Sequence, residues 1–232
     1  MKAAEFDRFA EEYRAQHKAN IAISGEDPAY FAAYKIKILA NTLAGRGGHA
    51  EKILDFGSGI GNSVPYFREY LPASSVTCAD ISKKSMELSQ LRFPGDERYL
   101  EIEGEHIPGD DGSFDAVFSA CVFHHIPNGE HIHWLSELHR LTKSGGTIMV
   151  FEHNPWNPLT VRAINSCPFD RNARLISARQ FASRFHETGW RDVQIRYHVF
   201  FPRALTALRV LDCALSWFPL GAQYAVTATR PS

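Results

Sequence analysis

The sequence lacks several features that would assign it to common functional classes. Its four cysteines form no C-x-x-C pair in 232 residues, which argues against a zinc knuckle or a redox dithiol. Lys and Arg total 25 against 26 Asp and Glu, a formal net charge of −1. This balance gives no basic field for the phosphates of nucleic acids. We therefore expect a small-molecule partner and no nucleic acid.

Long hydrophobic runs are also absent from the sequence. Residues 1–14 are charged and amphipathic, without the apolar segment of a secretion signal, and no run is long enough to predict a transmembrane helix. Hydrophobic residues still make up 44% of the chain, which is ample for a buried core. We expect one soluble, cytoplasmic domain, with its cysteines as buried free thiols in a reducing compartment.

Short β-rich runs alternate with helical patterns along the chain, which predicts a parallel sheet covered by helices on both faces. The expected strands lie near residues 51–56, 75–80, 98–103, 114–120, 146–152, 192–200 and 222–229. The expected helices lie near residues 27–44, 61–71, 82–92, 130–142 and 177–188.

An acidic, glycine-rich turn follows the first expected strand, in the sequence I-L-D-F-G-S-G-I-G-N-S at residues 53–63. Glycine admits positive φ and removes the Cβ that would keep a ligand from the backbone. A helix beginning near Asn62 would point free N–H groups at that ligand. Compared with the dinucleotide pattern G-x-G-x-x-G, the third glycine, Gly61, comes one residue early, and Asp55 lies inside the motif.

This D-x-G-x-G-x-G turn resembles motif I of the class I S-adenosylmethionine (SAM) dependent methyltransferases. The resemblance implies an α/β, Rossmann-like, doubly wound sheet of seven strands in the order 3-2-1-4-5-7-6, with the last-inserted strand antiparallel. It also implies SAM as cofactor and S-adenosylhomocysteine as product. We expect a single domain over residues 1–232, with an N-terminal helical lid (1–45), a cofactor-binding core (46–152) and an acceptor side (153–232) that carries a helical insertion before the final strand.

Asp80 ends the second expected strand, 25 positions after Asp55. A carboxylate there is suited to accept hydrogen bonds from both ribose hydroxyls, or it caps the helix after Ser82. The cofactor contacts expected from these two strand ends are Asp55, Gly57, Ser58, Gly59, Gly61, Asn62, Asp80 and Ile81.

The segment E-I-E-G-E-H-I-P at residues 101–108, followed by F-D-A-V at 114–117, resembles the D-A-E-x-L-P…F-D-x-V segment of small-molecule methyltransferases. By this resemblance Glu103 or Glu105 receives the adenine amino group, with Gly104 between them. His106 either flanks the adenine or is an ordinary exposed loop histidine.

The segment C-V-F-H-H-I-P at residues 121–127 resembles the V-L-H-H-I segment of the same family, and L-T-K-S-G-G at 141–146 resembles its L-K-P-G-G. The resemblance implies that the backbone of Ser119 and Ala120 faces the methionine end of the cofactor and that His125 lies near the sulfonium. No metal is expected, because the adjacent His124 and His125 should point apart and no carboxylate or cysteine stands at ligand spacing.

Two further side chains are candidates for work at the methyl acceptor. His153 follows the fifth expected strand, and its imidazole could act as a general base near neutral pH or could only shape the pocket. Tyr13 ends F-D-R-F-A-E-E-Y, a segment that resembles the lid of small-molecule methyltransferases. The alternative for this segment is an amphipathic helix packed on the core.

Apolar residues at 205, 208, 211, 215 and 218 form one stripe at helical spacing. The stripe packs on the core, covers a hydrophobic acceptor pocket, or makes peripheral contact with a membrane that carries a lipid-linked acceptor.

The sequence thus predicts a SAM-dependent methyltransferase with an unidentified small-molecule or lipid-linked acceptor. One alternative is an NAD(P)-dependent Rossmann-fold reductase, although the early third glycine and the lack of a Y-x-x-x-K pair count against it. The other is a non-catalytic SAM-binding protein. Nothing in the sequence indicates the oligomeric state.

Overall fold

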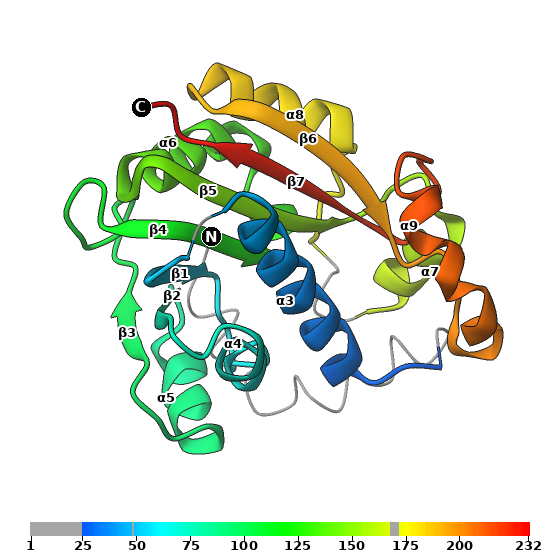
Figure 1. The fold of residues 1–232 in the computed structure, drawn as a ribbon, viewed down its shortest axis with the longest axis horizontal. Helices are drawn as coiled ribbons and strands as arrows, with labels where there is room; N and C mark the ends of the chain where they lie inside the picture. Colours follow the sequence, from blue (N-terminus) through cyan, green and yellow to red (C-terminus); the bar gives the residue numbers. More distant parts are fainter. Residues whose placement is uncertain (1–24, 48, 168–171) are drawn as a thin grey trace.

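A seven-stranded sheet in the order β3-β2-β1-β4-β5-β7-β6 forms the centre of the protein (Figure 1). The computed structural model describes residues 25–47, 49–167 and 172–232. Strands β1 to β5 pair in parallel, and β7 lies antiparallel between β5 and β6. The strands are β1 (Lys52–Phe56), β2 (Ser75–Asp80), β3 (Arg98–Glu101), β4 (Phe114–Ala120), β5 (Thr142–His153), β6 (Arg191–His198) and β7 (Gln223–Thr229). The predicted α/β class, strand order and antiparallel strand are confirmed.

Helices cover both faces of the sheet, as the alternating pattern predicted. They are α3 (Pro28–Gly45), α4 (Val64–Tyr70), α5 (Lys83–Arg92), α6 (His131–Leu141), α7 (Pro158–Ser166) and α8 (Ala178–Glu187). Leu39 of α3 and Phe67 of α4 share a buried cluster with Phe118 of β4. On the other face, Leu135 of α6 and Phe181 of α8 pack in a second cluster. Successive strand side chains enter the two clusters alternately.

Several elements differ from their predicted bounds. Helix α4 begins at Val64 rather than near Asn62, because residues 61–63 complete the glycine turn. Strand β3 ends at Glu101, two residues early. Helix α7 was not predicted; its start is set by Asn157, whose side chain caps the Thr160 N–H, and by a proline in the first turn.

The predicted helical insertion before the final strand is present as the 3-10 segment η4 (Arg203–Leu211) followed by α9 (Asp212–Leu215). Leu205 has non-helical dihedrals that break the segment, so the apolar stripe does not form one α-helical face. The predicted alternative in which the stripe packs on the core is wrong, because most of its large side chains are exposed. Those exposed side chains are Leu205, Leu208, Leu211 and Phe218.

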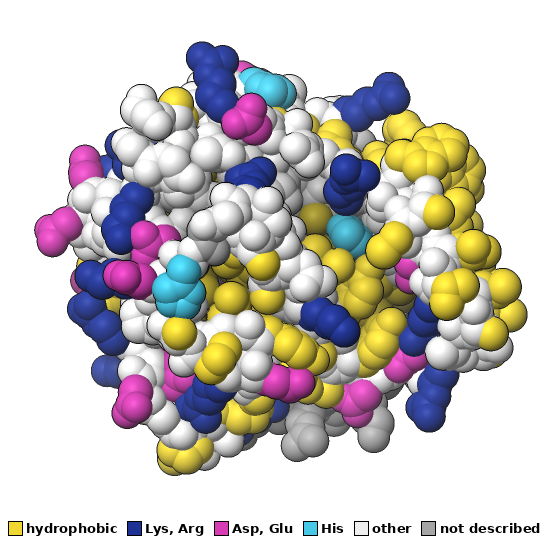
Figure 2. All heavy atoms as spheres, in the orientation of Figure 1, with side chains coloured by type: hydrophobic (Ala, Val, Ile, Leu, Met, Phe, Trp, Pro, Cys, Tyr) yellow, Lys and Arg dark blue, Asp and Glu magenta, His cyan; other side chains and the backbone are white. Residues whose placement is uncertain are grey.

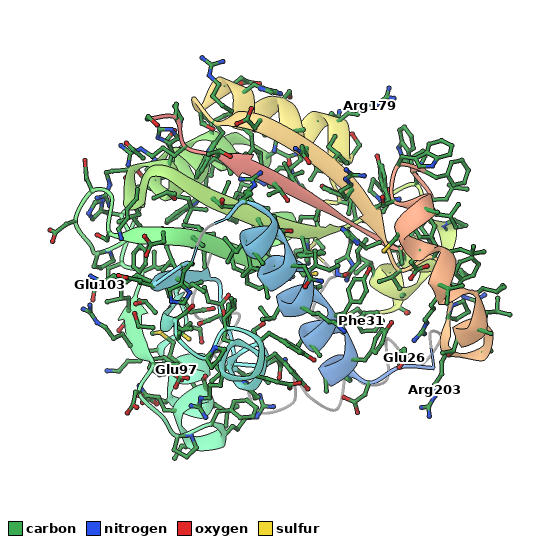
Figure 3. All side chains as sticks on the ribbon, in the orientation of Figure 1. Glu26, Phe31, Glu97, Glu103, Arg179 and Arg203 are labelled. Atoms are coloured by element: carbon green, nitrogen blue, oxygen red, sulfur yellow. The ribbon has the colours of Figure 1, made fainter. Side chains whose placement is uncertain are left out.

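Contacts with the start of α3 hold this insertion in place. The Arg209 guanidinium donates to Glu26 at 2.6 Å and stacks 4.7 Å from the Tyr30 ring centroid. Figure 3 shows Glu26 and Arg203 near each other between α3 and η4. The exposed insertion therefore has a fixed position beside α3.

Helix α3 packs on the sheet through Ile36, Leu39 and Leu43, although residues 1–45 were predicted as a lid. A lid formed by the preceding residues stays a prediction, since residues 1–24, including Tyr13, lie outside the described residues. No helix among the described residues has the length and hydrophobicity needed to cross a membrane.

Candidate functional site

The glycine turn folds over the end of β2. Gly57 and Ser58 donate their N–H groups to Ala79 O at 2.8 and 3.2 Å, and Gly59 N donates to Asp80 Oδ2 at 2.8 Å. A Cβ on Gly57 would lie 2.4 Å from Val122 Cγ2, and one on Gly61 would lie 2.0 Å from Ser89 Oγ. A Cβ on Gly59 would meet nothing within 4 Å. The turn is therefore packed on the protein side and open at its centre, as a backbone that contacts a ligand must be.

Asp80, the last residue of β2, contacts the middle of this turn through Gly59. Its second oxygen accepts the Ser82 N–H at 2.8 Å, while the Ser82 hydroxyl, not Asp80, caps helix α5. A carboxylate oxygen can accept more than one hydrogen bond, hydroxyl donors included. The position suits the predicted ribose contact, which stays a prediction.

Asp55 is buried at the start of the turn, and its Oδ2 has no hydrogen-bond partner among the described residues. Burial, with a smaller effect of the Asp80 charge, raises the pKa of Asp55 to about 7. A buried carboxylate oxygen without a partner is unfavourable. A cationic ligand group would relieve both effects, and the ammonium of SAM has the required charge.

The residues predicted at the adenine follow β3 in an exposed turn. Glu103 and His106 form an isolated bridge, and Figure 3 labels Glu103 beside β3, far from Phe31 on α3. Glu103, Gly104, Glu105 and His106 are all exposed. His106 contacts Glu137 at 2.8 Å, so its side chain is tied to α6. The adenine contacts of this turn stay predictions.

The carboxyl end of β4 brings Ser119, Ala120 and Cys121 toward the glycine turn. The Ser119 hydroxyl is buried and has no hydrogen-bond partner among the described residues. Cys121 has a φ of +61° and donates its N–H to Phe151 O at 2.8 Å. Val122, the next residue, fills the space beside Gly57. The two strand ends therefore form one continuous site.

A buried ion pair that the sequence did not predict fixes the segment after β4. Glu152, near the end of β5, is 1% exposed and contacts His124 Nδ1 at 2.7 Å. It also accepts the N–H groups of Val122 and Phe123 at 3.0 and 2.7 Å. Burial raises the pKa of Glu152, but the charge and hydrogen bond of His124, the His153 charge and the Phe123 N–H outweigh it and lower that pKa to about 2.

The rings of the predicted His125 and His153 both lie close to the ring of His124. The ring centroids are 4.1 Å apart for His124 and His125 and 5.1 Å for His124 and His153. The expectation that the adjacent rings point apart is thus wrong. Within the described residues, no three His, Cys, Asp or Glu side chains form a group that could hold a metal ion.

Polar side chains from β6, β7 and α3 complete the edge beside His153. Gln223 pairs with His153 in the sheet register, and Tyr34 OH lies 3.1 Å from His198 Nδ1. Burial, and then the Arg196 charge, lowers the pKa of His198 to about 4, so this ring is neutral at pH 7. These groups come from segments far apart in sequence, so the sequence motifs did not predict that they belong to one site.

The cysteines differ from the expectation of uniform burial. Cys78 and Cys167 are buried, whereas Cys121 is partly exposed and Cys213 is exposed. Cys121 contacts Lys35 Nζ at 3.2 Å. Its place directly after β4, at the edge where parallel sheets bind ligands, is the signal that could have marked it.

This strand order, with a glycine turn between the ends of β1 and β2, defines a class I Rossmann-like methyltransferase fold. Residues 54–150 match the family model described as a methyltransferase domain. Residues 54–150 therefore carry a methyltransferase domain, and the fold of the described residues is that of the methyltransferases that use SAM as methyl donor.

Known sequences and structures resemble the chain to different extents. It is 30% identical over 108 residues to a demethylmenaquinone methyltransferase of Thermus thermophilus, covering 45% of this chain and 48% of that one. It is 35% identical over 117 residues to the demethylmenaquinone methyltransferase of Clavibacter sepedonicus, covering 48% and 45%. The chain thus spans about half the length of these curated relatives.

Solved structures of two methyltransferases share the fold over nearly the whole chain. A SAM-dependent methyltransferase from Thermotoga maritima has a TM-score of 0.68 at 16% identity, covering 98% of this chain and 99% of that one. The methyltransferase in complex with the Trm112 activator from Haloferax volcanii has a TM-score of 0.68 at 18% identity, covering 100% of both chains.

Proposed function

We propose that this domain is an active SAM-dependent methyltransferase whose acceptor is a hydrophobic, lipid-like small molecule. The observation that carries the proposal is the glycine turn, which is packed on the protein side and open at Gly59, with the Asp80 carboxylate bound to the Gly59 N–H. SAM supplies an electrophilic methyl group on a sulfonium when bound. The protein must then hold the acceptor in line with that methyl group and exclude water.

Each strand end has a role in this proposal. Asp80 binds the ribose hydroxyls, Asp55 faces the ammonium of the cofactor, and the backbone of Ser119 and Ala120 lies beside its methionine part. His153 accepts a proton from the acceptor where one must leave, and His125 borders the same space. The orphaned oxygens of Asp55 and Ser119 support this placement.

The hydrophobic acceptor is supported by an exposed apolar surface at the acceptor side. Figure 2 shows hydrophobic side chains gathered over the η4 and α9 end of the molecule. This apolar surface consists of Leu205, Leu208, Val210, Leu211, Trp217, Phe218 and Leu220, with Trp156 and Leu159 exposed near α7. Soluble proteins seldom expose so many large apolar side chains together without a binding role. The quinone methyltransferases among the relatives have acceptors of matching chemistry.

Asp80→Ala should weaken binding of S-adenosylhomocysteine by about 10- to 100-fold, because hydrogen bonds to a charged group contribute roughly 1.5–3 kcal/mol each. Isothermal titration calorimetry measures this directly. Asp110→Ala, at an exposed carboxylate in the loop before β4, is the matched control and should bind like the unmodified protein. Equal affinities of the two variants would remove Asp80 from the ribose site.

The acceptor class can be read from methyl-labelled SAM incubated with the protein and with separated lipid, polar-metabolite and macromolecular extracts. We expect label in the lipid fraction. Val210→Asp with Trp217→Asp should lower this labelling at least about tenfold while S-adenosylhomocysteine affinity is kept, since each large apolar side chain contributes about 1.5–3 kcal/mol when buried. Val210 and Trp217 are 83% and 70% exposed, so the fold should tolerate both changes.

Leu91→Asp is the matched control for this experiment, because Leu91 is 80% exposed on α5, outside the apolar surface. Label in the polar fraction, or equal loss with Leu91→Asp, would contradict a lipid-like acceptor. Absence of label in every fraction, with cofactor binding intact, would favour the non-catalytic SAM-binding protein.

A further inference from the structure

The thiol of Cys121 lies in a cluster of cationic and amide groups that come from three separate elements. Lys35 of α3 is 7% exposed, and its Nζ lies 3.2 Å from Cys121 Sγ. Gln223 Nε2, at the start of β7, lies 3.8 Å from the same sulfur. His153, at the end of β5, is near enough for its charge and hydrogen bonding to lower the pKa of the thiol. Cys121 therefore belongs to a cluster of polar side chains that the fold brings together.

The nearby carboxylate of Glu152 does not compete with Cys121 for the Lys35 ammonium. Glu152 is engaged by His124 and by two backbone N–H groups. Lys35 otherwise lies 5.9 Å from the Phe151 ring centroid, a contact that supplies no full negative charge. A buried ammonium favours an anion in contact with it. The thiolate form of Cys121 supplies that anion.

The site also has a buried polar atom without a hydrogen-bond partner. Gln223 is 8% exposed, and its Oε1 has no hydrogen-bond partner among the described residues. Because Gln223 Nε2 contacts Cys121 Sγ, the amide oxygen of the same side chain lies beside the thiol. A ligand with a hydroxyl or N–H group would satisfy this acceptor.

We propose that Cys121 is an ionised, nucleophilic thiolate that forms covalent adducts with soft carbon electrophiles of the enone and quinone class. Cys121 as a residue is partly exposed, which gives an electrophile a route toward its side chain. In the reaction, Cys121 Sγ forms a bond to the electrophilic carbon, the π electrons of the C=C bond move to the carbonyl oxygen, and the resulting enolate takes a proton from water. This reactivity does not depend on methyl transfer.

The charges around Cys121 set the sign of its pH dependence. Burial raises the pKa of the thiol, and Glu152 acts in the same direction. The charges of His153 and Lys35 and the His153 hydrogen bond outweigh both and lower it to about 6. Tyr224 of β7 also faces this group. The thiolate should thus persist well below the pH at which a free cysteine, with a pKa of about 8.5, ionises.

The test is the pH dependence of N-ethylmaleimide addition, followed by intact-protein and peptide mass spectrometry on the full chain. The Cys213→Ser variant removes the exposed thiol and serves as the background. We expect one adduct, at Cys121, whose rate is half-maximal near pH 6 after correction for reagent hydrolysis. Adding Lys35→Met should move the half-maximum upward by at least one pH unit. The His153→Gln variant should move it in the same direction.

Two results would overturn the proposal: an unreactive Cys121, or a half-maximum above pH 8 in the unmodified site. Folding of each variant is checked by its melting temperature. If Lys35→Met does not fold, the comparison uses His153→Gln, and an unshifted half-maximum in that variant also overturns the proposal. If methyl transfer were absent while the pH dependence of N-ethylmaleimide addition was as expected, the result would contradict the proposed function and leave the thiolate proposal standing.

Discussion

Replacing Glu152 with alanine should lower the free energy of unfolding by about 3–5 kcal/mol, because removal of one partner leaves a buried group without compensation. Here His124 and the N–H groups of Val122 and Phe123 all lose their acceptor. Chemical denaturation with urea measures the loss. Asp111→Asn is the control, since its contact with Arg140 is made by a side chain that is 74% exposed, and such pairs contribute about 0–1 kcal/mol.

The contribution of Glu152 should also depend on pH in a defined direction. Its folded-state pKa of about 2 lies below the usual value of 4.5. The stabilisation is therefore complete above pH 4.5 and is lost as the pH falls toward 2. The stability difference between the unmodified protein and Glu152→Gln should shrink over this window. A difference that is constant from pH 7 to pH 3 would contradict an ionised Glu152.

Gly61→Val should lower stability by about 3 kcal/mol or more and should abolish measurable binding of S-adenosylhomocysteine. Gly61 has a φ of +74°, a conformation that costs an L-residue roughly 1–2 kcal/mol, and overpacking adds about 1–3 kcal/mol. The new Cβ would lie 2.0 Å from Ser89 Oγ and 2.9 Å from Ser89 Cβ. Ser89 is fully buried and bonded to Tyr99 OH, so it cannot move aside at low cost.

Gly59→Ala is the matched variant, because its φ is also positive but its Cβ meets nothing. It should cost only about 1–2 kcal/mol of stability while still weakening cofactor binding, since the methyl group would project into the open centre of the turn. Thermal denaturation and calorimetry separate the two effects. If Gly59→Ala bound the cofactor with unchanged affinity, the open side of the turn would not be its binding surface.

The features that the sequence predicted well are local ones. The alternation of β-rich and helical segments predicted the layers of sheet and helices, and the glycine turn with Asp55 indicated the class of fold. Both signals could be recognised because each lies within about ten adjacent residues. The strand order came from the resemblance alone. The bounds of α4 and β3 shifted by two residues or so because turns, rather than hydrophobic periodicity, end those elements.

The features that the sequence did not predict are produced by tertiary packing. Lys35 and Cys121 are 86 positions apart, and Cys121 and Gln223 are 102 apart, so no motif spacing connects them. Cys121 has a positive φ, and the sequence could not predict it because the residue is not a glycine. The stripe at residues 205–218 has the spacing of an amphipathic helix. The 3-10 geometry of Arg203–Leu211, the break at Leu205 and the exposure of most of its leucines show that it does not pack on the core as one α-helix.

The antiparallel direction of β7 has a consequence for how such proteins can diversify. Because β7 runs against β5, its first residue Gln223 and the last residue of β6, His198, pair at the same edge as His153. The whole connection between β6 and β7 therefore enters and leaves the fold at the ligand edge. If this connection contacts the acceptor, as proposed above, we expect a connection of different length or chemistry to change the acceptor preference. The glycine turn, and with it the proposed contact to the methyl donor, would stay the same.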